Sequence, residues 1–243
     1  DDAFELIARN ARLQRLTLNH CKLSPAHYAV LQKLPELTEL YLEGRELDDE
    51  LLSGLPALRK LETLFVRRPN VTSQSLPRIV ELTRLQKLAL DCASIGDDNI
   101  ALLKALKNLH ILHLNGTSVT SASLSHLREL KQLHWLRLDD TRIGDSGFEQ
   151  LTDLPLTQLS LSNTAVGSQS LSQIAKIRTL QQLSLGGRTS TLTDANLVQL
   201  APLTKLEFLN LSSNAITDKG LVHLQSLKNL RRLHIDSRAT RSA

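Results

Sequence analysis

Histidine, cysteine and acidic side chains are the residues that could carry out chemistry in this sequence, but their spacing matches no common catalytic pattern. The sequence has no Gly-x-Gly-x-x-Gly, no Gly-x-x-x-x-Gly-Lys-(Ser/Thr), no Gly-x-Ser-x-Gly and no His-Glu-x-x-His motif. His110 and His134 recur in the same register, with His113 close by, yet no third ligand accompanies them. Protein zinc sites use three or four such ligands. We therefore expect no catalytic residue, no bound metal and no cofactor.

An internal repeat defines the elements that position these residues. The pattern Leu-x-x-Leu-x-Leu occurs ten times, with Val66 or Ile235 at the third apolar position in two of the copies. Its copies begin 23 to 26 residues apart, at Leu13, Leu37, Leu61, Leu85, Leu109, Leu133, Leu156, Leu180, Leu206 and Leu230.

Each repeat divides into a strand half and a helical half. Leu16-Thr17-Leu18 alternates apolar and polar residues, which is strand spacing, whereas Ile100, Leu103 and Leu106 have helical spacing. Nine Ser or Asp residues precede the helical halves as candidate N-caps, among them Asp97, Asp145 and Asp194. One strand and one helix cannot bury their own apolar faces, so the repeats must stack.

The repeat therefore predicts an α/β solenoid with one parallel sheet on its concave side and helices on its convex side. Residues 1–12 should form an N-terminal helical cap, and residues 13–243 should form ten repeats, the last of them incomplete. At about 4.8 Å per strand, the sheet should be about 48 Å long.

The turn after each strand carries a family resemblance. The stretch Leu-x-x-(Thr/Asn)-x-(Ile/Val) appears at Leu114–Val119, Leu138–Ile143, Leu161–Val166 and Leu211–Ile216. In this feature the chain resembles leucine-rich repeat proteins, and its style is similar to the 24-residue repeats of bacterial and F-box-linked proteins. The polar residue of the turn should bond to backbone groups left unpaired at the strand end. Arg45, Pro69 and Ala93 depart from this pattern.

The sheet face that points away from the helices is the predicted binding surface. Of seven aromatic residues, Phe4, Tyr28 and Phe148 share one core column, whereas the other four fall on this face. Exposed apolar patches mark interaction sites, and Trp, Tyr and Arg are common binding anchors. The simpler alternative is that these rings only stack on one another as cross-strand pairs. The predicted partner-binding residues are Tyr41, Phe65, Arg67, Lys87, Ile111, His113, Trp135, Arg137, Asp139 and Phe208.

A broad, shallow surface of this kind favours a protein partner over a small-molecule substrate. The resemblance implies one more specific alternative, the substrate-recognition part of a ubiquitin-ligase adaptor or a bacterial effector. A second alternative is anion or nucleic-acid binding by a row of basic residues before the strands. Nucleic acid is the less favoured partner because no aromatic residue interleaves with that row. The row consists of Arg12, Arg59, Lys60, Arg84, Lys107, Lys131, Arg178, Lys205 and Lys228.

Cysteine usage and the chain ends bear on the compartment. Cys21 and Cys92 lie three repeats apart, about 14 Å, which is too far for a disulfide. Unpaired thiols favour the cytoplasm, or the host cell if the protein is a delivered effector. No apolar run reaches the roughly 18 residues that a membrane helix needs, so membrane insertion is not expected. Because strand Leu233–Ile235 lacks a following helix, we expect further sequence beyond Ala243.

Overall fold

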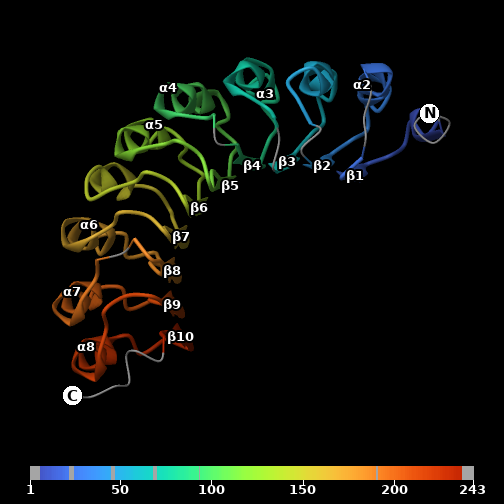
Figure 1. The fold of residues 1–243 in the computed structure, drawn as a ribbon. Helices are drawn as coiled ribbons and strands as arrows, with labels where there is room; N and C mark the ends of the chain where they lie inside the picture. The colour runs from blue at the N-terminus through green and yellow to red at the C-terminus, as the bar shows by residue number, and fades with distance from the viewer. Residues whose placement is uncertain are drawn as a thin grey trace.

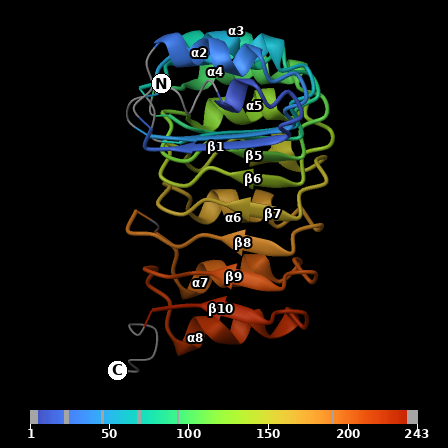
Figure 2. The same cartoon turned by 90° about the vertical axis from the view of Figure 1, so that its right-hand side faces the viewer.

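The repeats stack into a curved solenoid in the computed structural model of the chain. Strands line the inner side of the arc and helices line the outer side (Figure 1). Turning the molecule shows the strands from β5 to β10 stacked one below another (Figure 2). The structure describes residues 6–21, 25–44, 47–67, 70–92, 94–189 and 191–236, with the side chains of residues 25–28 outside this description.

Within the described residues, ten strands form a single parallel sheet in chain order. Each strand pairs with the next without crossovers, as the repeat predicts. The strands are β1 (Arg15–Asn19), β2 (Glu39–Glu43), β3 (Thr63–Arg67), β4 (Lys87–Asp91), β5 (Ile111–His113), β6 (Trp135–Arg137), β7 (Gln158–Ser160), β8 (Gln182–Ser184), β9 (Phe208–Asn210) and β10 (Arg232–His234).

The convex side consists of short α-helices and 3₁₀-helices. The α-helices are α2 (Pro25–Gln32), α3 (Leu76–Ile79), α4 (Asp97–Ile100), α5 (Leu124–Leu127), α6 (Ser168–Ile174), α7 (Asp194–Leu197) and α8 (Asp218–Leu221). The 3₁₀-helices are η1 (Leu51–Ala57), η2 (Ser73–Ser75), η3 (Ala101–Ala105), η4 (Ser121–Ser123), η5 (Phe148–Leu151), η6 (Val198–Leu200) and η7 (Val222–Ser226).

The repeat leucines form one continuous core between the sheet and the helices. Leu112 and Leu136, in neighbouring strands, are both 0% exposed, as is Phe148 on the helical side. Phe4 and the side chain of Tyr28, which we placed in the same column as Phe148, lie outside the described residues. The core therefore follows the spacing of the repeat wherever the structure describes it.

The turn residues bond to the backbone as the repeat pattern predicts. Thr117, Thr141 and Thr164 are buried, and each hydroxyl donates to the carbonyl three residues before it, at 2.6–2.7 Å. Asn214 donates from its amide to the carbonyls of Leu211 and Leu185, both at 3.0 Å. Arg45, Pro69 and Ala93, which depart from the pattern, lie outside the described residues.

Two of the aspartates that we expected to cap helices, Asp97 and Asp194, join neighbouring repeats instead. The N-caps of α4 and α7 are Gly96 and Thr193, one residue before Asp97 and Asp194. The Asp97 carboxylate accepts from the backbone N–H and hydroxyl of Thr120, at 2.8 and 2.6 Å. Asp194 receives the same pair from Thr217, at 2.7 and 2.6 Å. At these two positions the N-cap prediction was wrong, because each carboxylate bonds to the turn of the following repeat. The Asp48 carboxylate, in contrast, accepts from the backbone N–H of Leu51 at the start of η1, at 3.0 Å.

Asp145 also bonds to the following repeat, and replacing it with alanine should lower the stability of the solenoid. Its carboxylate accepts from the backbone N–H groups of Gly167 and Ser170, at 2.7 and 3.0 Å. The variant leaves partly buried donors unpaired, so unfolding in urea at pH 7 should require about 1–3 kcal/mol less free energy. Asp153→Ala, at an exposed position, is the control and should change stability by less than about 0.5 kcal/mol.

The contribution of Asp145 should also depend on pH. Burial raises the pKa of the Asp145 carboxyl, but hydrogen bonds from Ser170 and Gly167 outweigh it, so the pKa lies below its ordinary value. A lowered pKa stabilises the fold above the ordinary value and stops doing so as pH falls through the folded value. The difference between wild type and Asp145→Ala should therefore shrink in strong acid. A difference that stays constant down to pH 2 would contradict this assignment.

Candidate binding surface on the concave face

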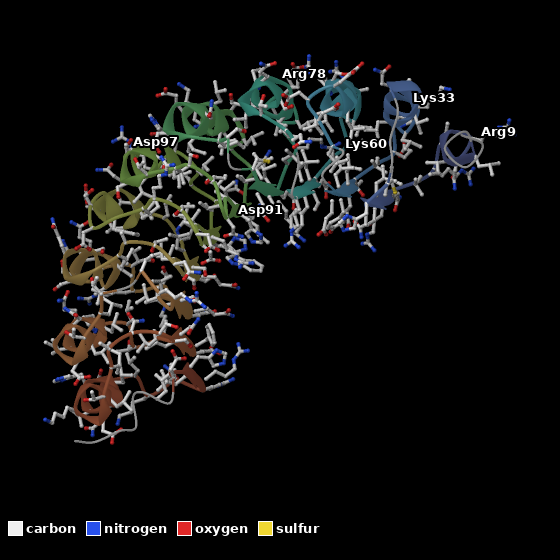
Figure 3. All side chains as sticks on the ribbon, viewed as in Figure 1. Arg9, Lys33, Lys60, Arg78, Asp91 and Asp97 are labelled. Atoms are coloured by element: carbon white, nitrogen blue, oxygen red, sulfur yellow. The ribbon has the colours of Figure 1, made fainter. Side chains whose placement is uncertain are left out.

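The concave face is built from side chains that alternate with the buried leucines. Figure 3 shows Asp91 on the inner side of the arc and Arg78 on the outer side. Strand register aligns the inner residues in rows that run across the sheet. One row contains Tyr41, Phe65, Ala89, His113 and Arg137. The row beside it contains Lys87, Ile111, Trp135, Gln158, Gln182 and Phe208.

Four rings form a continuous ridge across this face, and we call Tyr41, Phe65, His113 and Trp135 the aromatic ridge. The ring centroids of Tyr41 and Phe65 are 5.2 Å apart, edge to face. Phe65 lies 5.8 Å from His113, and His113 lies 4.9 Å from Trp135. Such geometries are favourable for aromatic pairs. Ala89 stands between Phe65 and His113 in the row and is 0% exposed, so its small side chain lets the two rings meet.

His113 is buried within the ridge, although we expected an exposed residue. It is 4% exposed, because Phe65 and Trp135 flank its ring. Neither ring nitrogen has a hydrogen-bond partner in the part of the chain that the structure describes. Burial, together with the charges of Arg137 and Arg67, lowers the pKa of His113 to about 4. The imidazole is therefore neutral at neutral pH.

The variant His113→Phe should be more stable than the wild type by about 1 kcal/mol at pH 7. A phenyl ring keeps the aromatic contacts and removes two buried polar atoms without partners. It should also flatten the pH dependence, because the pKa of His113 is about 4 in the folded chain against an ordinary 6.5. The stability held by neutral His113 is complete above pH 6.5 and is lost as pH falls towards 4.

Urea unfolding at pH 7.5, 5.5 and 4 measures both effects. The matched control is His223→Phe, at an exposed position, which should leave the pH dependence unchanged. Parallel pH curves for the wild type and His113→Phe would contradict the buried, neutral state of this residue.

The charged residues beside the ridge are largely paired with one another. Arg137 binds the Asp139 carboxylate through Nε and Nη2, at 3.1 and 2.8 Å. Asp139 is 6% exposed and also accepts from Ser160 and from the backbone N–H of Ser162. We expected Asp139 to be available to a partner, but its oxygens are already occupied within the chain.

A second pair flanks the ridge on β3 and β4. The Arg67 Nε lies 3.5 Å from a carboxylate oxygen of Asp91. Burial raises the pKa of Asp91 above its ordinary value, although Arg67 opposes this effect. The other carboxylate oxygen of Asp91 is buried and has no hydrogen-bond partner in the described part of the chain. Removing the largely buried Asp91 carboxylate from water therefore costs free energy that the ion pair with Arg67 only partly offsets.

The N-terminal end of the ridge is fixed by a third ion pair. Arg15 holds Glu39 with two bonds of 2.7 Å, and the hydroxyl of Tyr41 donates to the same carboxylate at 3.1 Å. Burial and this bond raise the pKa of Tyr41. Ile111, half-buried, and Lys87, exposed, occupy neighbouring positions of the adjacent row.

Phe208 lies apart from the ridge. Three strand spacings, about 14 Å, separate it from Trp135 in the same row. Its ring contacts His234, at a centroid distance of 5.1 Å, and the guanidinium of Arg232 lies over it, also at 5.1 Å. The predicted set of aromatics therefore divides into one ridge and one separate residue.

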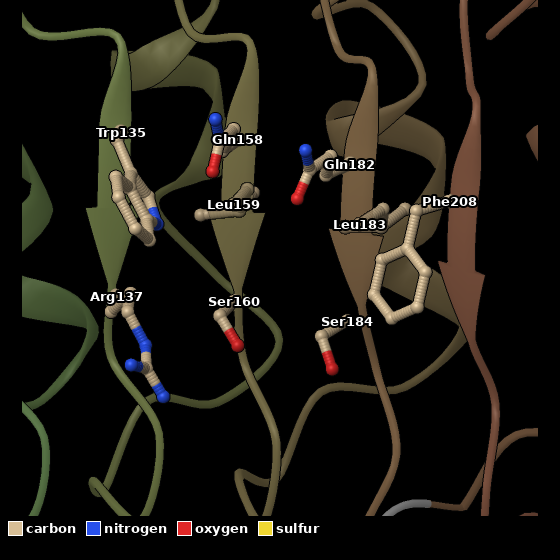
Figure 4. Close-up of a pocket in the computed structure, with 9 residues that line it drawn as sticks. All are labelled: Trp135, Arg137, Gln158, Leu159, Ser160, Gln182, Leu183, Ser184 and Phe208. Atoms are coloured by element: carbon tan, nitrogen blue, oxygen red, sulfur yellow. The ribbon is translucent and has the colours of Figure 1, made fainter. Parts of the chain in front are cut away.

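A shallow hollow of about 160 Å³ lies between Trp135 and Phe208 (Figure 4). We call this hollow the polar trough. It lies over β7 and β8, whose residues our predicted set omitted, although that set includes Trp135, Arg137 and Phe208 from its lining. Strand register alone could have placed Gln158, Ser160, Gln182 and Ser184 there, but these four residues are neither aromatic nor charged. Its lining consists of Trp135, Arg137, Gln158, Leu159, Ser160, Gln182, Leu183, Ser184 and Phe208.

Comparison with known proteins identifies the family. A family model described as a leucine-rich repeat region matches residues 7–243. The chain belongs to the leucine-rich repeat family. A search of curated proteins gives no match.

Solved structures support the leucine-rich repeat fold. An internalin (inlF) of Listeria monocytogenes is 24% identical with a TM-score of 0.68, over 93% of this chain and 68% of that one. Internalin C2 of the same organism is 23% identical with a TM-score of 0.64, over 86% and 84%. The TLR13–ssRNA13 complex gives 23% and 0.61, over 94% and 36%. At these identities the likeness establishes the fold alone.

The remaining candidate sites of this leucine-rich repeat chain are a pair of histidines and the two cysteines. His110 and His134 pack edge to face at 5.4 Å, and no three His, Cys, Asp or Glu residues gather as metal ligands within the described ranges. Cys21 and Cys92 are both free, as their spacing predicted. Burial raises the pKa of the Cys92 thiol to about 12. Over the same ranges, no helix has the length and apolar character to cross a membrane.

Two members of the predicted basic row pair with acids. Lys60 contacts Glu36 at 2.6 Å, and Lys107 lies 3.7 Å from Glu129. A third basic residue at the edge, Arg231, is outside the predicted row and lies 3.9 Å from Glu207. These contacts are exposed and individually weak, but they reduce the positive field along the edge.

Proposed function

We propose that this leucine-rich repeat chain recognises a protein partner through its concave face, without catalysis. The aromatic ridge is the observation that carries the proposal. The fold does not require rings at these positions, since Thr17, Ser160 and Ser184 occupy equivalent places on other strands. Half-buried aromatic side chains bordered by arginines are the usual anchors of protein interfaces.

The dimensions of the ridge favour a macromolecular partner. It extends from β2 to β6, four strand spacings or about 19 Å. This span suits an interface of about 800 Å² per partner. Small-molecule sites are deeper, with volumes of about 300–1,000 Å³ that enclose most of the ligand. The neighbouring polar trough is smaller than that range, at about 160 Å³, and a second hollow beside Tyr41 and Phe65 lies at its lower end, at about 350 Å³. Both hollows are open to solvent and would not enclose a ligand.

Anion binding along the edge is less well supported. Acidic side chains accompany Lys60 and Lys107, so the edge offers an anion a mixed rather than a uniformly positive surface. The TLR13 structure is described as a complex with single-stranded RNA, but that description concerns a chain only 23% identical to this one. We therefore favour a protein partner.

Capture of partner proteins from the cell that produces the chain tests this proposal. The immobilised wild-type chain should retain a partner that the Trp135→Ala chain loses. The edge variant Lys107→Ala should retain the same partner. Loss with Lys107→Ala but not with Trp135→Ala would move the interface to the edge and favour an anionic partner.

A further inference from the structure

The polar trough contains hydrogen-bonding groups that the chain does not use. Gln158 and Gln182 are neighbours in strand register, and both are half-buried. Neither carboxamide has a hydrogen-bond partner within the described ranges of the chain. Figure 4 shows both side chains on the face between the rings of Trp135 and Phe208. Each carboxamide offers two donors and one acceptor to whatever occupies the trough.

The hydroxyls beside the two glutamines are already engaged. Ser160 donates to Asp139 at 2.5 Å. Ser184 shares a 2.8 Å hydrogen bond with Ser162 and accepts from Asn210 at 3.0 Å. Recognition in the trough therefore depends on the two carboxamides rather than on the serines.

Among the residues that line the trough no charge is free, although the guanidinium of Arg232 stacks over the ring of Phe208 at one end of it. Arg137 is the charged residue of its lining, and Asp139 holds that guanidinium through two hydrogen bonds. The other half of the concave face differs, because Arg15, Glu39 and Arg67 lie along it. A charged group buried against Gln158 and Gln182 would lack a counter-ion, which is strongly unfavourable. The complementary occupant of the trough is therefore uncharged.

The spacing suits an extended polypeptide. Trp135 and Phe208 are three strand spacings apart, about 14 Å. An extended chain advances about 3.3 Å per residue, so about four residues cover that distance. A peptide group supplies one donor and one acceptor, which a carboxamide can pair with. The backbone groups of β7 and β8 are engaged with neighbouring strands, so side chains must make these bonds.

We propose that the polar trough binds an uncharged, extended peptide segment of the protein partner. The main chain of the segment pairs with the carboxamides of Gln158 and Gln182. One apolar side chain packs against Trp135, and another, about four residues away, packs against Phe208. This inference rests on the proposed function, since it names the part of the partner that the concave face recognises.

Selection of peptides on the intact chain tests the inference. The probe is a phage-displayed library of random 12-residue peptides, selected on the immobilised wild-type chain. Enriched sequences should contain an uncharged run of about five residues with apolar residues near its two ends. Trp135 is the single tryptophan of the chain, so its fluorescence reports binding of the corresponding synthetic peptides directly.

Two sets of variants show whether the carboxamides bind the peptide. The double variant Gln158→Ala/Gln182→Ala should lower peptide affinity at least tenfold, while Gln169→Ala, exposed on α6, should change it less than twofold. Gln158→Glu/Gln182→Glu keeps the side-chain size and should also lower affinity at least tenfold. Thermal melting confirms that each variant is folded.

Modified peptides test the main-chain contacts. N-methylation of the central peptide bonds removes their donors and should weaken binding at least tenfold to wild type. It should have much less effect on the double alanine variant, because the partner group has already been removed. Equal losses on both proteins would overturn the main-chain pairing.

Other outcomes would also overturn the inference. Enrichment of charged sequences, or of no sequence, would do so. Binding that survives both double variants but is lost with Phe65→Ala would leave concave recognition standing and move the peptide site to the ridge. Binding insensitive to Phe65, Trp135 and both glutamines would remove the proposed function as well. A glycan could also occupy the trough, and maltohexaose and chitohexaose test this. If either quenched the fluorescence of Trp135 and lost binding in both double variants, while peptide binding did not depend on the glutamines, the trough would be a glycan site.

Discussion

Replacing Leu136 with alanine should lower the free energy of unfolding by about 2–5 kcal/mol. The side chain is 0% exposed and lies at the centre of the sheet. Its strand register places it between Leu112 on β5 and Leu159 on β7, so a cavity there borders three repeats. Because each repeat of a solenoid is stabilised by its neighbours, the loss should extend to both adjoining repeats.

Urea unfolding and hydrogen exchange measure these two effects. The matched control is Leu102→Ala, the same substitution at a side chain that is 40% exposed, and it should change stability by less than about 0.5 kcal/mol. Amides of β5 and β7 should exchange faster in Leu136→Ala than in the control. Equal effects of the two substitutions would show that the assigned repeat register is wrong.

The repeat predicted the fold because its leucines obey one rule in every copy. A residue such as Leu136 must face the helices whenever its neighbours two positions away do so, and stacking then fixes strand order. The helix starts were less predictable. Asp97 and Asp194 have suitable side chains for N-caps, but the cap depends on which backbone residue is extended. In both cases that residue is the preceding one, and the carboxylate bonds to the next repeat.

The composition of the concave face was also predictable, whereas the contacts on it were not. Register placed Phe65 and His113 two strands apart in one row. Their contact depends on Ala89, whose side chain is too small to separate them. The burial of His113 then follows from the rings on either side of it, which a single sequence position does not reveal. The exposed aromatic patch is therefore smaller than the sequence indicated, because His113 is buried and Phe208 lies apart.

The polar trough shows a different limit. Gln158 and Gln182 have no property that distinguishes them from other polar residues on a solvent-facing strand. They become notable because Trp135 and Phe208 enclose them and because the chain leaves their carboxamides unpaired. Both features depend on side-chain positions across four strands, which spacing alone does not determine.

Trp135→Ala should weaken binding of the captured partner by about 2 kcal/mol or more, which is about 30-fold in Kd. Trp135 is the residue shared by the aromatic ridge and the polar trough, so its loss removes contacts from both. The ring also packs on the buried His113. The melting temperature should therefore fall slightly, but much less than for Leu136→Ala.

The order of effects among variants is the decisive measurement, made by titrating the captured partner against each protein. Tyr41→Ala should weaken binding less than Trp135→Ala, because Tyr41 lies at the far end of the ridge and its hydroxyl is held by Glu39. Lys107→Ala should have almost no effect, because that side chain is exposed at the edge and lies beside Glu129. If Lys107 and Lys131 mattered and Trp135 did not, the concave interface would be wrong. If Trp135→Ala weakened binding only because the chain unfolded, Trp135→Phe would show it. This variant keeps a ring over His113, so it should remain folded and bind with intermediate affinity.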